Sequence, residues 1–288
     1  TVVYCDTGVE IPTINNLVYE KLNKLQNDII EHNLPIDIRI IKPKLEDRYF
    51  VKVIGRGYPT PTNKFRWCTD RLRILPIQKI MKNSKYTVLV GVREGESQER
   101  DKIINRNRTD KEFYLTQANY PNVKLFAPIL NYKVDDIWST INNQNPPTSL
   151  SGNDLELIYK MAGEAPDDLR NFSTDVLKKG RFGCWTCTVI RKDKAVNNLI
   201  CNGFSELEPL LHYRNWLSEI REDKQYRCSL RRNGQKGPGP FTLDARYEML
   251  KKLLETQENC GIRLIEEKEI KLIKELWNKD LKSSIYIE

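Results

Sequence analysis

Long apolar runs are missing from this sequence: the longest, Tyr86–Val92, is far shorter than the roughly 20 residues of a membrane-spanning helix. The first residues, Thr1–Tyr4, also lack the basic segment that opens a secretory signal peptide. Hydrophobic residues make up 39% of the chain and charged residues 30%, the balance of a folded protein and not of a disordered one. We therefore expect a cytoplasmic protein with no membrane partner.

Histidine is scarce as well, since His32 and His212 are the only two. This scarcity argues against catalysis centred on histidine. The odd number of cysteines argues against a framework of disulfide bonds and leaves reduced thiols that bind a metal as the main alternative. The seven cysteines are Cys5, Cys68, Cys184, Cys187, Cys201, Cys228 and Cys260.

Positive charge is in excess, with 47 Lys and Arg residues against 39 Asp and Glu residues and a net charge of +8. An excess of this size is compatible with a polyanionic partner such as nucleic acid or ATP. It is also common in proteins that bind neither.

Apolar strands and amphipathic helices alternate in the first half of the chain. We predict strands at Val2–Tyr4, Ile36–Ile41, Tyr86–Val92 and Val123–Phe126. We predict helices at Thr13–His32, Asp70–Lys82 and Val134–Ile141. This order predicts an α/β fold whose doubly wound, mostly parallel sheet has helices on both faces. Ligands bind beyond the carboxyl ends of such strands, which is where Asp6, Thr7 and the segment after Val92 are expected.

Helical patterns dominate from about Pro146 onward. The predicted helices are Leu155–Met161, Leu207–Ile220, Ala245–Gln257 and Lys268–Lys279. The sequence thus predicts an α/β domain at 1–145 and a mainly helical region at 146–288.

The turn after the first strand, Asp6–Gly8, offers a carboxylate, a hydroxyl and free backbone N–H groups. These groups suit ribose, phosphate or Mg²⁺. The alternative is a turn in which Asp6 or Thr7 only caps the following helix.

The strand Tyr86–Val92 leads into a charged segment that contains Arg93, Glu96, Ser97 and Arg100. Arginines bind phosphate in a bidentate manner, and a serine adds a neutral donor. The alternative is a solvated charged loop. The position after a core strand favours a binding site.

Cys184 and Cys187 form a CxxC pair, and Cys68 lies far upstream. Such a pair holds zinc, an iron–sulfur cluster or a redox disulfide. A metal site is favoured over buried inert cysteines. Zinc and a cluster both need a fourth ligand, for which Cys201 is preferred over Cys228.

The segment Arg231–Pro240 is basic and rich in Gly and Pro. Its arginines and flexible backbone suit a nucleic-acid phosphate chain. The alternative is an exposed loop between two helices.

Several of these segments resemble the phosphoadenosine-phosphosulfate reductase group of ATP pyrophosphatases. The resemblance lies in Asp6–Pro12, Arg66–Pro76, Gly91–Arg100 and Ala127–Trp138. Within the group, four further segments resemble the DndC-like sulfurtransferases of DNA phosphorothioate modification. These are Arg181–Ile190, Asp193–Ala195, Pro209–Asn215 and Gly239–Arg246.

The resemblance implies a sheet of the adenine-nucleotide α-hydrolase type and a role in DNA modification and restriction–modification. ATP is cleaved at its α-phosphate, a DNA phosphate is activated as an adenylate, and sulfur from a cysteine desulfurase replaces a non-bridging oxygen. Other phosphorothioation-complex proteins are expected partners.

The same resemblance assigns roles to individual residues. Asp6, Thr7, Gly91, Val92 and Arg93 would contact nucleotide or Mg²⁺. The charged segment, with Arg93, Glu96, Ser97 and Arg100, would act where charge develops in the transition state. The cysteines Cys68, Cys184 and Cys187, with Cys201, would ligate a 4Fe–4S cluster.

The family's Ser-Gly-Gly-Lys-Asp-Ser loop is not in this sequence, and we expect it, with a first strand, upstream of Thr1. The family also predicts a cysteine shortly before Arg181, where Val176–Lys179 stand. Two rival functions stay open. One is a sulfonucleotide reductase that uses Cys260 of Glu258–Arg263, and the other is a non-catalytic DNA- or partner-binding module.

Overall fold

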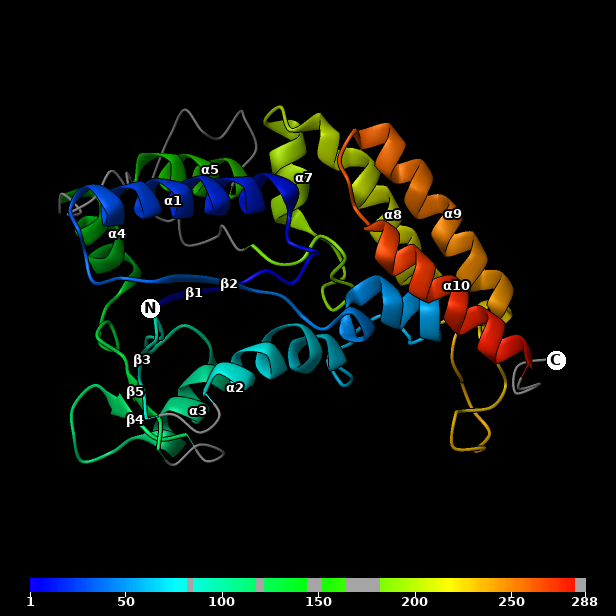
Figure 1. The fold of residues 1–288 in the computed structure, drawn as a ribbon, viewed down its shortest axis with the longest axis horizontal. Helices are drawn as coiled ribbons and strands as arrows, with labels where there is room; N and C mark the ends of the chain where they lie inside the picture. Colours follow the sequence, from blue (N-terminus) through cyan, green and yellow to red (C-terminus); the bar gives the residue numbers. More distant parts are fainter. Residues whose placement is uncertain (82–84, 118–121, 144–151, 164–181, 283–288) are drawn as a thin grey trace. The chain divides into compact units, whose positions relative to one another are not determined.

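The computed structural model describes residues 1–81, 85–117, 122–143, 152–163 and 182–282 (Figure 1). The chain divides into two compact units. Unit 1 comprises Thr1–Pro76 and Leu157–Glu288, and unit 2 comprises Ile77–Glu156. The domains predicted from the sequence, 1–145 and 146–288, divide the chain differently and stay a prediction.

Unit 1 begins with strand β1 (Val2–Cys5), which pairs in parallel with β2 (Ile38–Ile41). Helix α1 (Pro12–Glu31) connects them and starts with a proline, whose fixed φ suits the first turn of a helix. The register aligns Cys5 with Ile41, so both strands end at the same level. Asp6 and Lys42, the residues that follow, therefore lie next to each other.

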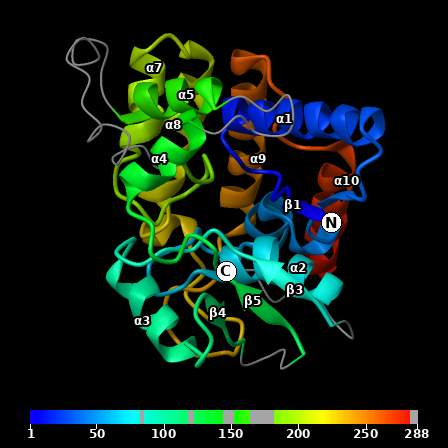
Figure 2. The ribbon, with the colours of Figure 1, turned by 90° about the vertical axis from the view of Figure 1, so that its left-hand side faces the viewer.

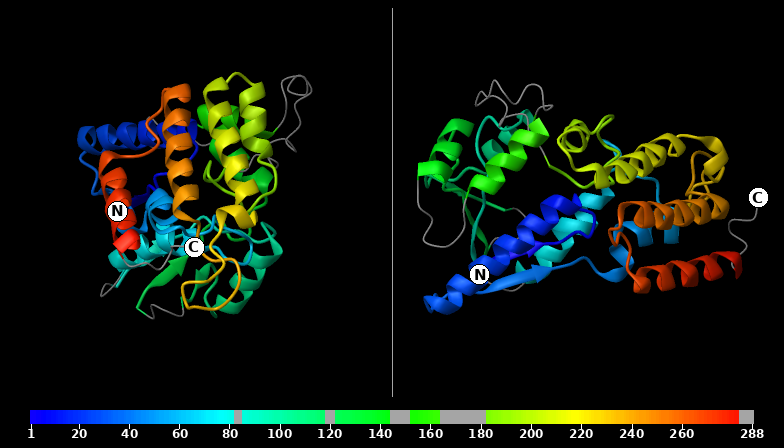
Figure 3. Two further views of the ribbon diagram at one scale, coloured as in Figure 1. Left: turned by 90° about the vertical axis from the view of Figure 1, so that its right-hand side faces the viewer. Right: turned by 90° about the horizontal axis from the view of Figure 1, so that it is seen from above.

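The rest of unit 1 is mainly helical. Its helices are α7 (Lys194–Cys201), α8 (Glu208–Ile220), α9 (Leu243–Cys260) and α10 (Glu267–Lys282), while α5 (Asn153–Gly163) crosses the division between the units. Helix α8 packs on α9, and Figure 3 shows α9 (orange) between α8 and α10 (red). Their contact faces hold the fully buried side chains Leu217, Met249 and Leu253. Gly261, with a φ of 67°, ends α9 in the left-handed conformation that favours glycine.

A buried π-helical turn, Val51–Gly55, packs against α9 and α10. A Cβ atom on Gly55 would lie 2.9 Å from Leu276 Cδ1, so a larger residue here would require the end of the Leu276 side chain to shift. Trp277 Nε1 donates to the carbonyl of Ile54 at 2.8 Å. The segment before α2 (Leu75–Met81) is also π-helical, over Thr69–Ile74. Turns of this kind often occur at functional sites.

Unit 2 contains a three-stranded sheet in the order β3–β5–β4 (Figure 2). Strand β3 (Thr87–Leu89) is parallel to β5 (Lys124–Phe126), and β4 (Tyr114–Leu115) is antiparallel to it. The unit also has α3 (Gln98–Asn107) and α4 (Val134–Asn143). Its core comprises Ile104, Leu115, Ala127 and Leu130.

The α/β class predicted from the sequence is confirmed. The four predicted strands are present: β1 is one residue longer than predicted, and the other three are shorter. Within the described residues the strands form two sheets, β1–β2 and β3–β5–β4, and a single doubly wound sheet stays a prediction. Two helices were missed, α3 and α7, because charged and short segments resemble loops in sequence. No helix in the described part of the chain combines the length and apolar character that crossing a membrane requires.

Candidate functional site: a buried carboxylate beside a group of thiols

Asp6 lies directly after β1 and is only 4% exposed. Its carboxylate accepts hydrogen bonds from Tyr19 Oη at 2.7 Å and Gly8 N at 2.9 Å, and pairs with Lys42 Nζ at 3.0 Å. Burial acts to raise the pKa of Asp6, but these donors outweigh it and lower the pKa below its ordinary value. Asp6 is therefore a fixed negative charge at the end of β1.

Thr7 and Glu10 form the next layer of this turn. Thr7 Oγ1 donates to Glu10 Oε1 at 2.6 Å, and Thr7 N donates to the same oxygen at 3.3 Å. The other oxygen, Glu10 Oε2, is buried and has no hydrogen-bond partner among the described residues. Neither Asp6 nor Thr7 caps α1, whose N-cap is Ile11 without a side-chain bond. The polar groups of this turn are thus not used to start the helix.

A cleft of about 290 Å³ opens beside this turn within unit 1. Its polar lining includes Asp6, Glu10, Lys42, Arg48, Glu266 and Glu269. Arg48 bridges the last two, at 2.8 Å to Glu266 and 3.2 Å to Glu269. Burial raises the pKa of Glu269, so it is the carboxyl of this pair that retains a proton more readily. The cleft therefore presents both positively and negatively charged side chains to a polar ligand.

The CxxC turn lies against the Asp-Thr-Gly turn. Glu10 and Cys184 form an isolated antiparallel bridge, and Trp185 N donates to the carbonyl of Val9 at 3.0 Å. Cys184 Sγ is 4.0 Å from Thr7 Oγ1. Burial raises the pKa of Cys184 to about 12, against the lowering effect of Arg73. Without a metal this thiol stays protonated at neutral pH.

Cys68 reaches the same neighbourhood from the residue before the π-helical turn Thr69–Ile74. Burial raises the pKa of the Tyr49 hydroxyl, and the charges of Cys68, Cys187 and Cys184 raise it further. The three predicted thiol ligands therefore lie in the neighbourhood of one buried phenol. Burial, and then the charge of Cys187, also raise the pKa of Cys68.

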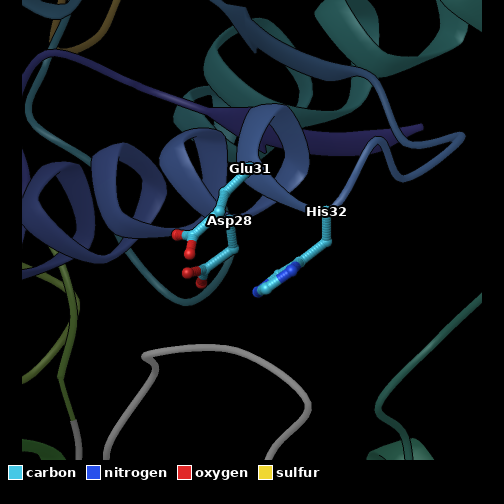
Figure 4. A group of neighbouring side chains, drawn as sticks. All are labelled: Asp28, Glu31 and His32. Carbon is cyan, nitrogen blue, oxygen red and sulfur yellow. The ribbon is translucent and has the colours of Figure 1, made fainter.

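The spacing of these thiols tests which metal they fit. Among the described residues, the one group of three or more candidate ligands whose donor atoms all lie within 4.8 Å is Asp28, Glu31 and His32, near the end of α1 (Figure 4). The cysteines are therefore more widely spaced than this. Two thiolates on one zinc ion lie no more than about 4.6 Å apart, because each Zn–S bond is about 2.3 Å. Cys68, Cys184 and Cys187, as placed in the described structure, are therefore not all within the reach of one zinc ion.

The fourth ligand is not located by these contacts. Cys201 is exposed at the end of α7, and Cys228 pairs its backbone with Pro240 and Gly239. Cys5, at the end of β1, has its pKa raised to about 11 by burial and is acted on by Glu10 and Arg73, as Cys184 is. The position before Arg181 that the family pattern pointed to lies outside the described residues.

The loop that follows Cys184 is fixed by side chains from other segments. Arg214, only 1% exposed, donates to the carbonyls of Cys187 at 2.8 Å and Arg191 at 3.1 Å, and also to that of Ile190. Arg221 Nη1 donates to Thr188 O at 3.0 Å. Tyr49 Oη donates to Thr186 O at 3.3 Å. No local sequence pattern indicates that Arg214, Arg221 and Tyr49 support the CxxC loop.

The charged segment of unit 2 starts helix α3. Ser97 is its N-cap and accepts a hydrogen bond from Arg100 N at 3.3 Å, while Arg100 forms an ion pair with Glu96. Gly91 and Val92 follow β3, and Arg93 bonds only weakly to the carbonyl of Glu94, at 3.4 Å. The Arg93 side chain is thus held by a weaker interaction than the Arg100 side chain, which forms an ion pair. Arg93, Glu96 and Ser97 thus precede α3 and Arg100 lies in its first turn, so the segment predicted to bind phosphate leads into a helix N-terminus, a position that attracts anions.

Sequence reasoning missed three side chains of the site in unit 1: Tyr49, Glu10 and Arg73. Glu10 belongs to the motif that begins at Asp6 and ends at Pro12. Its place in this motif was the one feature of the sequence that pointed to a role in the site. The other two become neighbours of the thiols only through the tertiary fold.

Comparison with known proteins gives one match. A family model described as the phosphoadenosine phosphosulfate reductase domain matches residues 1–190. No curated protein and no solved structure matches the chain.

Proposed function

Because the chain belongs to the phosphoadenosine phosphosulfate reductase domain family, we propose that it is an ATP pyrophosphatase that transfers sulfur to the backbone phosphate of DNA. Family membership indicates an enzyme with sulfonucleotide-related or adenine-nucleotide-hydrolase-like chemistry. The observation that carries the finer proposal is the distance of 4.0 Å between Thr7 and the thiol of Cys184. The turn Asp6–Gly8, which suits a nucleotide, therefore lies next to the CxxC turn, which suits sulfur chemistry.

The proposed fold is a doubly wound, mostly parallel sheet of the adenine-nucleotide α-hydrolase type. The parallel pairs β1–β2 and β3–β5 support it, because parallel strands need crossover helices such as α1. The proposal places the catalytic domain at 1–145.

In the proposed reaction, a DNA phosphate oxygen attacks the α-phosphorus of ATP and pyrophosphate leaves. Asp6 holds Mg²⁺ or ribose, since its pKa keeps it charged, and Thr7 contacts the nucleotide. Gly91 and Val92 contact the nucleotide through their backbone. The side chains of Arg93, Glu96, Ser97 and Arg100 bind phosphate near the start of α3, where the helix dipole favours negative charge.

The thiols are proposed to hold a 4Fe–4S cluster through Cys68, Cys184 and Cys187, with Cys201 as the fourth ligand. When bound, such a cluster supplies a site for sulfide or electron transfer. The chain contributes the partly buried thiols Cys68, Cys184 and Cys187 and a loop whose backbone is held by Arg214. A cysteine desulfurase as sulfur donor, other phosphorothioation-complex proteins as partners and a cytoplasmic location complete the proposal.

Pyrophosphate release tests this function. Full-length protein, purified without oxygen, is expected to release pyrophosphate from ATP faster when DNA is present, and to incorporate sulfur from a desulfurase into DNA. Release that does not depend on DNA would contradict DNA as the acceptor. No turnover at all would favour a non-catalytic binding module.

A sulfonucleotide reductase is the second candidate, and one observation favours it. The residues after Cys260, Ile262–Glu266, line the same cleft as Asp6 and Thr7. The Cys260 thiol itself is held at the end of α9, 3.5 Å from Gln257 O and 3.7 Å from Ile262 O. Formation of sulfite from a sulfonucleotide with thioredoxin, abolished by Cys260→Ala, would favour this reductase over DNA modification.

A further inference from the structure

Two segments that are far apart in the sequence, Arg56–Trp67 and Arg227–Thr242, lie side by side in unit 1. Phe241 N donates to Gly57 O at 2.8 Å, and the Arg232 guanidinium bonds to the carbonyl of Arg56. The same guanidinium lies over the Tyr58 ring, 5.6 Å from its centroid. We call the exposed face of these two segments the basic surface.

The basic surface holds nearly all of the excess charge of the protein. The two segments contain seven Lys and Arg residues and no Asp or Glu, out of a net charge of +8. The rest of the chain therefore has a net charge of only +1. The seven cations are Arg56, Lys64, Arg66, Arg227, Arg231, Arg232 and Lys236.

Most of these cations point to solvent. Lys64, Arg66, Arg231 and Lys236 are exposed, and none of the four forms an ion pair within the part of the chain that the structure describes. Phe65, between two of these cations, is 46% exposed. Unpaired cations around an exposed aromatic ring are the composition that contacts phosphates and stacks on bases.

The surface is held in shape before any ligand binds. Arg227 Nε donates to Gly239 O at 2.7 Å, and its Nη1 donates to Arg221 O at 2.7 Å. The backbone of 228–240 forms a hairpin, with Gly239 N bonded to Cys228 O at 2.8 Å. A Cβ on Gly239 would lie 1.9 Å from Leu230 O, so glycine is required for the close approach. A preformed surface loses less conformational entropy on binding than a flexible loop.

The basic surface also borders the thiol site. Pro61 O accepts hydrogen bonds from Thr188 Oγ1 at 2.8 Å and from Arg221 Nη1 at 3.2 Å. Thr188 directly follows Cys187, and Cys68 directly follows the first segment of the surface. The first segment of the surface is thus bonded directly to the loop that carries Cys187.

We propose that the basic surface binds the phosphodiester backbone of DNA and that Phe65 stacks on an unpaired base. This inference rests on the proposed function for the choice of DNA. It adds where the acceptor binds and which side chains hold it.

Anisotropy of a fluorescein-labelled DNA duplex with a single-stranded overhang, titrated with the full chain at several salt concentrations, tests the surface. The triple variant Lys64→Gln, Arg231→Gln, Lys236→Gln is expected to bind at least tenfold more weakly. Its slope of log K against log salt should fall by about 2 to 3, since each phosphate contact contributes about 0.9. The control triple Lys271→Gln, Lys274→Gln, Lys279→Gln removes three exposed charges from α10 and should stay within twofold of the unmodified protein.

Equal weakening by the two triples, or no weakening by the first, would overturn the inference. The stacking role is read separately: Phe65→Ala should weaken binding of the overhang about tenfold, and Phe65→Trp should restore it. An RNA duplex of the same sequence that competes as strongly as the DNA would overturn DNA as the partner.

This test needs neither ATP nor metal, so it separates the two proposals. If the protein binds DNA through the surface but releases no pyrophosphate, the proposed surface stands and the proposed function is contradicted. If instead the protein shows DNA-stimulated pyrophosphate release while the triple variant Lys64→Gln, Arg231→Gln, Lys236→Gln binds DNA as tightly as the unmodified protein, the function stands and the surface is overturned.

Discussion

The loop Cys184–Arg191 of unit 1 is fixed by distant side chains, whereas the segment Arg93–Arg100 of unit 2 is fixed by its own neighbours. Backbone carbonyls of the first accept hydrogen bonds from Tyr49, Arg214 and Arg221. In the second, Ser97 and Glu96 both bond to Arg100 within one helical turn.

This difference separates the two kinds of candidate site. A loop held by tertiary contacts keeps its thiols in place whatever they bind, but it depends on the whole of unit 1. A segment held locally depends only on its helix and leaves Arg93 available to a ligand. The two regions should therefore respond differently to substitution.

The largest effect is expected at the thiols. Cys184→Ala and Cys187→Ala should each lose most bound iron and acid-labile sulfide, because a cluster needs every thiolate ligand. Both can be measured by colorimetric assays and visible absorbance on protein purified without oxygen. Cys260→Ala is the control and should keep its iron. Full iron in the first two variants, or a colourless protein with stoichiometric zinc, would contradict the cluster.

Arg93→Ala should lower pyrophosphate release about 100-fold or more, the usual effect of removing one donor to transition-state charge. Its melting temperature should not change, since the side chain makes only one weak bond. Arg106→Ala, an exposed arginine on α3, is the matched control and should leave the rate unchanged. Unchanged turnover in Arg93→Ala would remove it from the site.

Arg214→Met should lower the free energy of unfolding by about 3 kcal/mol, because several buried carbonyls lose their donor. Urea unfolding measures this loss. Arg191→Met changes an exposed side chain of the same loop and should cost less than about 0.5 kcal/mol. If the two variants were equally stable, the loop would not depend on Arg214.

Asp6→Asn should cost about 1 to 3 kcal/mol at neutral pH, since it weakens buried hydrogen bonds and an ion pair. The folded state lowers the pKa of Asp6, so its charge adds stability above the ordinary value of about 3.9. That contribution is lost as the pH falls through the lowered pKa. Stability curves of the two proteins should therefore converge in acid, and a constant difference would contradict the charge effect.

The sequence was informative where structure depends on neighbours along the chain. Strand β1, helix α1 and the polar turn from Asp6 follow from apolar patterning and a proline at the first helical position. Helix α3 was missed because half of its residues are charged, although Ser97 three residues before Arg100 is a capping signal.

The parts that the sequence did not predict depend on tertiary packing. Arg214 looks like any surface arginine in sequence, yet it is buried among carbonyls of a loop 23 to 27 residues earlier. That Cys68 lies near Cys184 was predicted from the family resemblance, and not from the spacing of the two residues along the sequence. The juxtaposition of Arg232 with Arg56 spans 176 residues, which no local pattern encodes.

Two of the five tryptophans adjoin the thiols, and this gives the protein an internal optical reporter. Trp67 stacks on Tyr49 with ring centroids 5.7 Å apart, and Trp185 lies within the CxxC turn, 5.9 Å from Phe50. An iron–sulfur cluster absorbs broadly at the wavelengths where tryptophan emits, so energy transfer would quench these two indoles. Loading and loss of the site can then be followed by intrinsic emission, with no label on the chain.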